Sequence, residues 1–343
     1  MKKTVKVGNI TLGDGKVYIQ SMLNRRSDDI IGSVEQAVEL EKAGCEIVRA
    51  AIPDMNAIRL IPAIKEKVNI PLVADIHFDY RLALEAVNAG VDKVRINPGN
   101  IGSADRVKAV ADACKNAGVP IRIGVNSGSV EKQLLAKYGS PTAEALVESA
   151  LNHVKLLNDA DFDDIVISIK SSNVNTMIDA YRLLSTKCDY PLHLGVTEAG
   201  TERSGIIKSA IGIGSLLHDG IGDTIRVSLT ADPVREIYAA QDILKSLGLK
   251  KGVEIVSCPT CGRTRINLIE LADKITAATS GIDKNIKVAV MGCVVNGPGE
   301  AKEADIGIAG GIGEAILFKK GEIIRKIKEE DIVSELLKEI EKL

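Results

Sequence analysis

The feature that most constrains the fold is a regular alternation of short β-branched runs with helical patterns along most of the chain. Ala-Gly pairs at 43–44, 89–90 and 117–118 end helical patterns directly before a strand. Eight strand–helix units in succession favour an α/β fold, a (β/α)8 barrel of TIM type. An open doubly wound sheet would carry Gly-x-Gly-x-x-Gly after its first strand, and this sequence does not. The expected strands are 17–22, 46–50, 71–76, 93–97, 120–126, 165–170, 191–197 and 224–228.

The same pattern predicts where the barrel ends and a smaller domain begins. Helices are expected at 33–43, with Ser33 as the cap, and at 104–117, 142–157 and 233–247. We therefore expect a barrel over 1–248, a Gly/Lys-rich linker at 248–252 and an α+β domain over 253–343. The elements expected in that domain are strands at 253–256, 288–291 and 306–309, helices at 264–279 and 329–343, and a hairpin turn at 318–322.

Composition excludes several classes of protein. The formal net charge of −2 gives no sign of nucleic acid or anionic membrane as a partner. No apolar run approaches the roughly 20 residues that span a bilayer, and the basic N-terminus lacks the apolar region of a signal peptide. Six scattered cysteines suit the reducing cytoplasm better than a disulfide scaffold. We interpret Cys45, Cys114 and Cys188 as packing residues.

Polar residues lie toward the C-terminal ends of all eight expected strands, where a buried parallel strand should be apolar. Active sites of TIM barrels lie at that face. A single arginine usually pairs with a nearby carboxylate, but four arginines and a lysine outnumber the available acids. Because arginine binds phosphate oxygens bidentately, the pattern predicts a site for a diphosphate. The residues are Gln20, Ser21, Arg49, Asp75, His77, Arg95, Asn97, Arg122, Asn126, Lys170, Glu198, Arg226 and Ser228.

Three thiols and a carboxylate follow two expected strands of the smaller domain. Cys258 and Cys261 form a Cys-x-x-Cys pair, Cys293 follows the next strand, and Glu300 comes seven residues later. A structural zinc site would require a fourth Cys or His, and a dithiol switch would leave Cys293 and Glu300 unused. An iron–sulfur cluster with three thiolates and one exchangeable oxygen ligand fits somewhat better than zinc.

Seven motifs, spread over nearly the whole chain, resemble the 4-hydroxy-3-methylbut-2-enyl diphosphate synthase family of the methylerythritol phosphate route to isoprenoids. They are Gln-Ser-Met (20–22), Ala-Asp-Ile-His-Phe (74–78), Val-Arg-Ile-Asn-Pro-Gly-Asn (94–100), Gly-Val-Thr-Glu-Ala-Gly (195–200), Gly-Asp-Thr-Ile-Arg-Val-Ser (222–228), Cys-Pro-Thr-Cys-Gly-Arg (258–263) and Cys-Val-Val-Asn-Gly-Pro-Gly-Glu (293–300). The sequence departs from the family in one place, because Leu23-Asn24-Arg25 stands where the family often reads Thr-Asn-Thr.

The resemblance implies a two-electron reductive ring opening and dehydroxylation of 2-C-methyl-D-erythritol 2,4-cyclodiphosphate, with flavodoxin or ferredoxin as the electron donor. It implies a [4Fe-4S] cluster held by Cys258, Cys261, Cys293 and Glu300. It also implies hydrogen-bonding or proton-transfer roles for Asp75 and Glu198 near the departing hydroxyl. The implied substrate-binding residues are Arg49, His77, Arg95, Asn97, Arg122, Asn126, Lys170, Arg226, Ser228 and, from the cluster side, Asn296.

Two other functions remain possible at this point. One is a non-redox iron–sulfur hydro-lyase acting on a phosphorylated polyol, and the other is a zinc-stabilised barrel that only binds a phosphosugar. A radical enzyme is disfavoured because the close three-cysteine cluster motif is missing.

The length of the chain between the two domains also predicts a dimer. The helix expected at 233–247 descends about 22 Å from the catalytic face, and the linker at 248–252 spans at most about 18 Å. One chain therefore cannot place its own cluster domain over its own barrel mouth. We expect a homodimer in which each cluster domain completes the partner's site, as the resemblance also implies.

Overall fold

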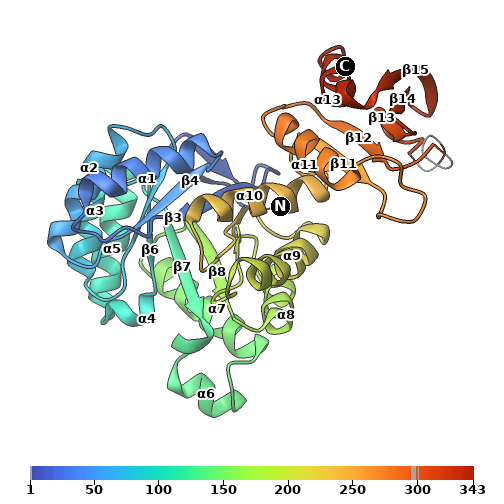
Figure 1. Ribbon diagram of the computed structural model, residues 1–343. Coiled ribbons are helices and arrows are strands. Elements are labelled where there is room, and N and C mark those ends of the chain that lie inside the picture. The colour runs from blue at the N-terminus through green and yellow to red at the C-terminus, as the bar shows by residue number, and fades with distance from the viewer. Residues whose placement is uncertain (1, 295–298, 300) are drawn as a thin grey trace. The chain divides into compact units, whose positions relative to one another are not determined.

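The computed structural model describes residues 2–294, 299 and 301–343, which form two compact units, Met1–Leu247 and Gly248–Leu343 (Figure 1). Each unit has a hydrophobic core of its own, because the buried apolar residues of each pack mainly against one another. Glu300 and Asn296, which the sequence predicts as a metal ligand and a substrate contact, lie outside the described residues.

The first unit is the expected (β/α)8 barrel. Its eight strands pair in parallel in the order β8-β7-β6-β5-β4-β3-β10-β9. A parallel bridge between Ile167 and Leu192 brings the β8 end of this order next to the β9 end and closes the ring. The strands are β3 (Tyr18–Met22), β4 (Ile47–Ala51), β5 (Leu72–Asp75), β6 (Lys93–Ile96), β7 (Ile121–Asn126), β8 (Ile165–Lys170), β9 (His193–Leu194) and β10 (Thr224–Ile225).

Helices cover the outside of the ring, each with an apolar stripe on the strands beneath it (Figure 1). On the last of them, Ile237, Ala240 and Leu244 recur at helical spacing and are buried. The main helices are α1 (Ile30–Lys42), α2 (Leu60–Lys65), α3 (Tyr80–Asn88), α5 (Ala104–Ala117), α7 (Ala143–Asp159), α8 (Val174–Ser185), α9 (Glu202–His218) and α10 (Pro233–Ser246). Shorter elements in the loops are η1 (Met55–Arg59), α4 (Pro98–Ile101), η2 (Ser127–Ser129) and α6 (Lys132–Tyr138).

Two local predictions in the barrel were wrong. The cap of α1 is Asp29, whose carboxylate accepts the backbone N–H of Gly32 at 2.9 Å, and Ser33 is buried inside the helix. The strands expected at 191–197 and 224–228 are much shorter, since β9 and β10 have two residues each. Beyond Leu194 the chain turns into a loop in which Glu198 has a φ of 51°. This left-handed conformation is incompatible with an extended strand.

An N-terminal hairpin, which the sequence analysis missed, closes one end of the barrel. Its strands are β1 (Val5–Val7) and β2 (Ile10–Leu12), paired antiparallel. Val5, Val7 and Leu12 pack with Ile47, Val73 and Val166, which lie low in the barrel interior. Strands of three residues carry too little periodicity to be recognised in a sequence.

The described part of the second unit is a five-stranded mixed sheet with the helices α11 and α13 and the short η3, as the predicted α+β domain requires. β11, β12 and β13 are parallel, and β14 and β15 continue the sheet antiparallel. The β14–β15 turn contains Lys320 and Gly321 with φ values of 49° and 81°, which suit a two-residue hairpin. The elements are β11 (Val253–Ser257), α11 (Leu268–Thr279), β12 (Ile286–Met291), β13 (Ile306–Gly310), β14 (Glu314–Lys319), β15 (Glu322–Lys328), η3 (Glu329–Asp331) and α13 (Ile332–Glu341).

Helix α11 begins four residues later than the expected start at 264. The backbone N–H of Arg265 is bonded to Gly292 O at 2.9 Å, and that of Thr264 to Cys261 O at 3.0 Å. These bonds hold the segment after the Cys-x-x-Cys pair against the end of β12, so it forms a loop.

Among the described residues, no helix is both long enough and apolar enough to cross a bilayer. Cys45 and Cys114 are buried and Cys188 is half-buried, in keeping with their interpretation as packing residues.

Candidate active site

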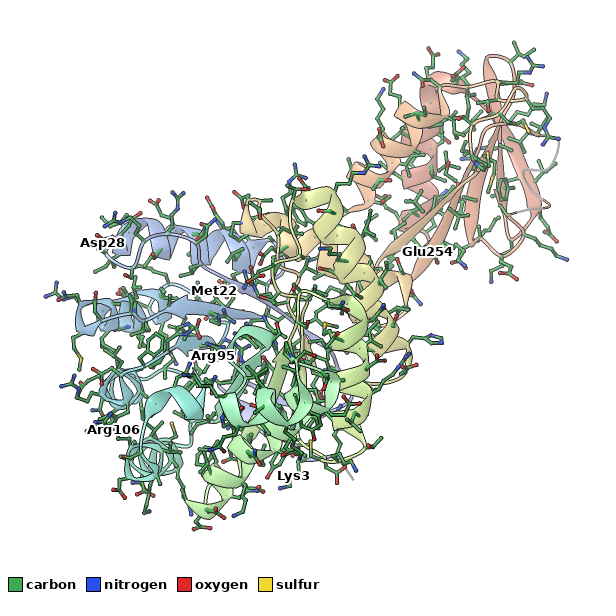
Figure 2. All side chains as sticks on the ribbon, turned by 90° about the horizontal axis from the view of Figure 1, so that it is seen from below. Lys3, Met22, Asp28, Arg95, Arg106 and Glu254 are labelled. Atoms are coloured by element: carbon green, nitrogen blue, oxygen red, sulfur yellow. The ribbon has the colours of Figure 1, made fainter. Side chains whose placement is uncertain are left out.

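The polar residues at the strand ends surround one cavity of about 410 Å³ at the C-terminal face of the barrel. Alternation along each strand places every second side chain inside the ring. Arg95 lies within the first unit in Figure 2, whereas Asp28 and Arg106 lie at its outer edge. The predicted residues that line the cavity are Arg49, Asp75, His77, Arg95, Arg122, Asn126, Lys170, Glu198, Arg226 and Ser228.

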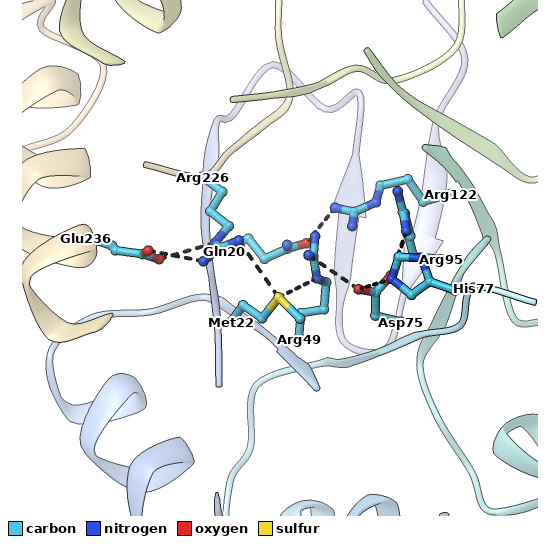
Figure 3. A network of polar contacts seen from close by, with 9 residues as sticks. All are labelled: Gln20, Met22, Arg49, Asp75, His77, Arg95, Arg122, Arg226 and Glu236. Atoms are coloured by element: carbon cyan, nitrogen blue, oxygen red, sulfur yellow. Dashed lines mark hydrogen bonds and ion pairs between the residues drawn. The ribbon is translucent and has the colours of Figure 1, made fainter. Parts of the chain in front are cut away.

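Asp75 is the centre of one half of the charge network (Figure 3). Its carboxylate lies 3.1 Å from Arg95 Nη1, 3.4 Å from Arg49 Nη2 and 3.4 Å from His77 Nε2. Burial alone would raise the pKa of Asp75, but Arg49, His77 and Arg95 together hold that pKa well below its usual range. Asp75 is therefore ionised and acts as an acceptor.

Glu236 is the centre of the other half, and the sequence analysis did not select it. Its carboxylate accepts from Arg226 Nη2 at 3.1 Å and Nε at 3.2 Å (Figure 3). It also accepts from Ser21 Oγ at 2.9 Å and from the backbone N–H of Leu229 at 3.1 Å. The signal was available, because Glu236 lies on the stripe of α10 that includes Pro233, Ile237 and Ala240. A carboxylate on a buried helical stripe is expected to have a cationic partner.

Arg122 and Lys170 are buried cations that make no salt bridge within the described part of the chain. Arg122 is fully buried, and its Nη1 donates to Gln20 Oε1 at 3.3 Å. Burial, together with Arg49 and Arg95, lowers the pKa of Arg122 well below its usual value. The pKa of Lys170 is lowered by burial and by the surrounding arginines, Arg49 and Arg226 foremost. Burial also lowers the pKa of Arg49, to about 10, although Asp75 opposes that shift.

The cavity therefore carries more positive than negative charge. Its described lining has five cationic side chains of Arg and Lys but only two carboxylates, Asp75 and Glu198. Removing such charges from water without partners is costly, and an anion with several oxygens would supply the missing partners. The arrangement suits an anionic ligand that bridges the ring of strands.

Two residues selected from the sequence, Asn97 and Glu198, lie in different surroundings. Asn97 is buried and caps α4, where its Oδ1 accepts the backbone N–H of Gly99 at 3.1 Å. Asn97 is not part of the described cavity lining. Glu198 lies at the exposed rim in the left-handed conformation, and such strain in a non-glycine residue is concentrated at functional sites.

The three thiols of the second unit lie at one edge of its sheet. β11 and β12 are parallel neighbours, with Ser257 opposite Val290, so Cys258 and Cys293 leave the sheet at the same edge. Cys258 Sγ accepts the backbone N–H of Gly292 at 3.2 Å, and Arg263 lowers the pKa of the exposed Cys261 through backbone and side-chain hydrogen bonds. Within the described residues, no three His, Cys, Asp or Glu side chains are close enough to hold a metal ion. The donors nevertheless suit iron and sulfide, because thiolates are the usual ligands of such clusters and commonly accept N–H bonds.

Comparisons with known proteins connect both units with one family. The family model described as the GcpE TIM-barrel domain matches residues 2–241, and the model of the GcpE protein C-terminal domain matches residues 254–342. A protein of Clostridium perfringens named 4-hydroxy-3-methylbut-2-en-1-yl diphosphate synthase (flavodoxin) is 64% identical over 341 residues, covering 99% of this chain and 98% of its own. A protein of the same name from Ruminiclostridium cellulolyticum is 62% identical over 343 residues, covering 99% and 97%.

Solved structures provide an independent comparison of the barrel. Dihydropteroate synthase from Stenotrophomonas maltophilia superposes with a TM-score of 0.54 at 14% identity, covering 71% of this chain and 97% of its own. The enzyme from Xanthomonas albilineans gives 0.51 at 11% identity, covering 72% and 99%. At such low identity the likeness concerns the fold alone.

Proposed function

Because the chain belongs to the GcpE family, we propose that it is a 4-hydroxy-3-methylbut-2-en-1-yl diphosphate synthase that takes its electrons from flavodoxin. The substrate is 2-C-methyl-D-erythritol 2,4-cyclodiphosphate. Two electrons and one proton open its ring and release one hydroxyl group as water, which leaves an open-chain allylic diphosphate. The observation that carries the proposal is the cavity of about 410 Å³ with five cationic side chains in its lining.

The cationic residues hold the diphosphate. Arg122 and Lys170 are the principal contacts, because neither has a carboxylate partner among the described residues and a phosphate oxygen would satisfy them. Arg49, Arg95 and Arg226 are held in position by Asp75 and Glu236 and present their remaining N–H groups to the ligand. His77, Asn126, Ser228 and Asn97 are the proposed polar contacts around them.

The two lining carboxylates have different roles. Asp75 is ionised because its pKa is held well below its usual range by Arg49, His77 and Arg95 against the effect of burial. It can therefore accept hydrogen bonds from the substrate but cannot supply a proton near neutral pH. Glu198 is the better candidate for donating the proton that leaves with the hydroxyl group, since it lies at the rim of the cavity.

A [4Fe-4S] cluster is the proposed cofactor, with Cys258, Cys261, Cys293 and Glu300 as ligands and Asn296 beside it. When bound, the cluster would pass electrons from flavodoxin, or from ferredoxin in its place, to the substrate. The support is the chemistry of the donors, since two neighbouring strand ends bring three thiols to one edge of the sheet. Thiols that must stay reduced also favour a cytoplasmic location.

The complete site is proposed to form between two chains. The N-terminal turn of α10 lies at the cavity, because Glu236 binds Arg226 there, and the helix then runs about 21 Å toward the opposite end of the barrel. Six residues separate the end of α10 at Ser246 from the start of β11 at Val253, and they span at most about 22 Å. A homodimer in which each second unit serves the partner's barrel avoids this limit.

The reaction itself tests the proposal. Anaerobically purified enzyme, supplied with the cyclic diphosphate and reduced flavodoxin, is expected to form the open-chain diphosphate, followed by phosphorus NMR and mass spectrometry. A reaction with oxidised flavodoxin is the control and should give no product. Conversion that needs no reductant would contradict the proposal and favour the hydro-lyase alternative.

A further inference from the structure

A polar layer lies inside the barrel at the floor of the anion cavity, where Arg122 belongs to both. Side chains that point inward from alternate strands form layers in a TIM barrel. Gln20, Arg122 and His193 come from β3, β7 and β9, which alternate around the ring. Lys93 is the first residue of β6 and lies two residues before the cavity-lining Arg95 on the same face of the strand. The N-terminal hairpin closes the barrel below with apolar side chains.

This layer and the adjacent Lys93 contain buried polar atoms without hydrogen-bond partners. Lys93 Nζ, Arg122 Nε, Gln20 Nε2 and His193 Nε2 are all buried, and none has a hydrogen-bond partner among the described residues. His193 uses its other ring nitrogen on Thr224 Oγ1 at 2.8 Å. The charged or titratable groups that face Lys93 are Arg122 from β7, Arg49 from β4 and His193 from β9. None of them carries a negative charge.

Lys93 is therefore a fully buried amine in a positive field. Burial is the main cause that lowers its pKa well below the usual value, and Arg122 and Arg49 lower that pKa further. Its neutral form is favoured until an anion binds, because a charged amine at this depth is removed from bulk solvent and faces no counter-ion among the described residues.

We propose that Lys93 is a further group for binding the diphosphate, which acts from beneath the cavity by taking up a proton from solvent when the anion enters. The anion contacts Arg122 and Arg49, the two cations that otherwise oppose a charge on Lys93. Once their field is cancelled, protonated Lys93 adds its own attraction to the bound anion. The inference rests on the proposed diphosphate site, which it deepens.

The coupling has a definite sign. A group whose pKa is low in the empty enzyme and higher in the complex binds a proton on complex formation. Affinity for the anion then falls as pH rises, by up to tenfold per pH unit for each proton taken up. Lys170 lines the cavity and its pKa is lowered by the same arginines, so it contributes to the uptake as well. The share of the proton uptake that belongs to Lys93 is the share that is lost when Lys93 is replaced.

The test is isothermal titration calorimetry on the anaerobic holoenzyme, without reductant, in buffers of different ionisation enthalpy. The probes are the cyclic diphosphate and inorganic diphosphate, and the variants are Lys93→Met and Lys93→Gln. Both variants are expected to take up about one proton fewer than the parent and to show a shallower fall of affinity with pH. Lys108→Met, which removes an exposed lysine of α5, is the control and should match the parent.

Two variants guard against an effect of misfolding, because Met fills the apolar volume and Gln keeps a neutral donor. Uptake that is unchanged in both variants, or lost entirely in Lys170→Met alone, would overturn the inference while leaving the diphosphate site intact. A third outcome would also overturn the inference. If the parent and Lys93→Met take up the same number of protons, and added chloride weakens binding only in the parent, then Lys93 holds a small anion that the diphosphate displaces. Failure of the parent to bind either probe would instead count against the proposed diphosphate site.

Discussion

Arg122 and Lys170 show how single residues in this barrel are placed for binding at the expense of stability. Both are buried basic side chains, and neither forms a salt bridge with the carboxylates described around them. Replacing a buried charge by an apolar side chain of similar size is often neutral or stabilising. The same replacement removes a charge-assisted contact to the ligand. The two effects have opposite signs and can be measured separately.

The variants Arg122→Met and Lys170→Met are expected to bind the cyclic diphosphate about ten- to a hundredfold more weakly, since a charge-assisted contact contributes about 1.5–3 kcal/mol. Their melting temperatures without substrate should equal or exceed that of the parent, and the visible spectrum of the cluster should be unchanged. Arg182→Met, which removes a half-exposed arginine paired with Asp219, is the control for affinity. Unaltered dissociation constants in both variants would make Arg122 and Lys170 structural.

The proposed cluster ligands differ in hardness, and this predicts different outcomes for their variants. Changing Cys258, Cys261 or Cys293 to Ser should remove most of the iron and sulfide, because thiolates hold the cluster. Changing Glu300 to Ala should leave the cluster bound by three thiolates but remove most activity. Iron and sulfide analysis, with an absorption spectrum, provides the measurement, and Cys188→Ser is the control with full iron content. Parental turnover by Glu300→Ala would exclude its role as the exchangeable ligand.

Most residues of the cavity could be predicted from the sequence, because charges that interrupt apolar strands stand out against their surroundings. Glu236 and Lys93 were missed for physical reasons. Glu236 comes from a helix, where a charged residue is ordinary until its stripe is known to be buried. Lys93 starts its strand, where a solvated lysine is common, and only the closed barrel shows that it is fully buried.

At the scale of elements, a glycine in β7 leaves room for Arg95 of the neighbouring strand β6 to reach the cavity. Gly124 lies between Arg122 and Asn126 on the inward face of β7. A Cβ built on Gly124 would lie only 2.4 Å from Arg95 Nε, so the guanidinium of Arg95 occupies the space that a side chain would take. The sequence shows the glycine, but only the register of β6 with β7 shows that the Arg95 side chain lies over it.

Gly124→Ala should therefore displace the Arg95 guanidinium from the cavity. Because the displaced group is the end of a flexible side chain, the melting temperature should change little, while substrate affinity falls by about tenfold or more. Calorimetric titration and thermal unfolding separate the two effects. Gly128→Ala is a matched control in the next loop, since its Cβ would meet no atom within 4 Å. A clear loss of stability at unchanged affinity would show that Gly124 is needed for packing alone.

Element boundaries were predictable where capping signals agreed with periodicity, as for α5, which begins and ends where expected at Ala104 and Ala117. They failed where backbone bonds to another segment override local preference. Residues 264–267 read as helix, but Arg265 is bonded to Gly292 across the sheet edge. Such tertiary bonds have no trace in local periodicity.

At the scale of the whole molecule, the separation of cations and thiols into two units makes complementation a direct test of the dimer. A barrel-inactive variant, Lys170→Ala, is mixed with a thiol-inactive variant, Cys293→Ser, and the subunits are allowed to exchange. Heterodimers are expected to regain one working site of the two, because one barrel and one second unit remain intact and belong to different chains. Activity is measured against mixing ratio, with mass spectrometry to follow the exchange.

Each variant mixed only with itself serves as the control and should stay inactive. A mixture that remains inactive despite complete exchange, or full activity in a monomer, would rule out sites completed by a partner chain.

The apolar hairpin beneath the barrel has a kinetic consequence. Because β1 and β2 pack Val5, Val7 and Leu12 against the low interior, the described residues leave the cavity no second exit at that end. Substrate and product must both pass through the mouth of the cavity at the C-terminal face, so product has to leave before the next substrate can bind. The product retains the diphosphate and therefore still binds the arginines of the cavity. Product release should therefore limit the rate of turnover. We expect the product to act as a competitive inhibitor, and turnover to slow as solvent viscosity is raised.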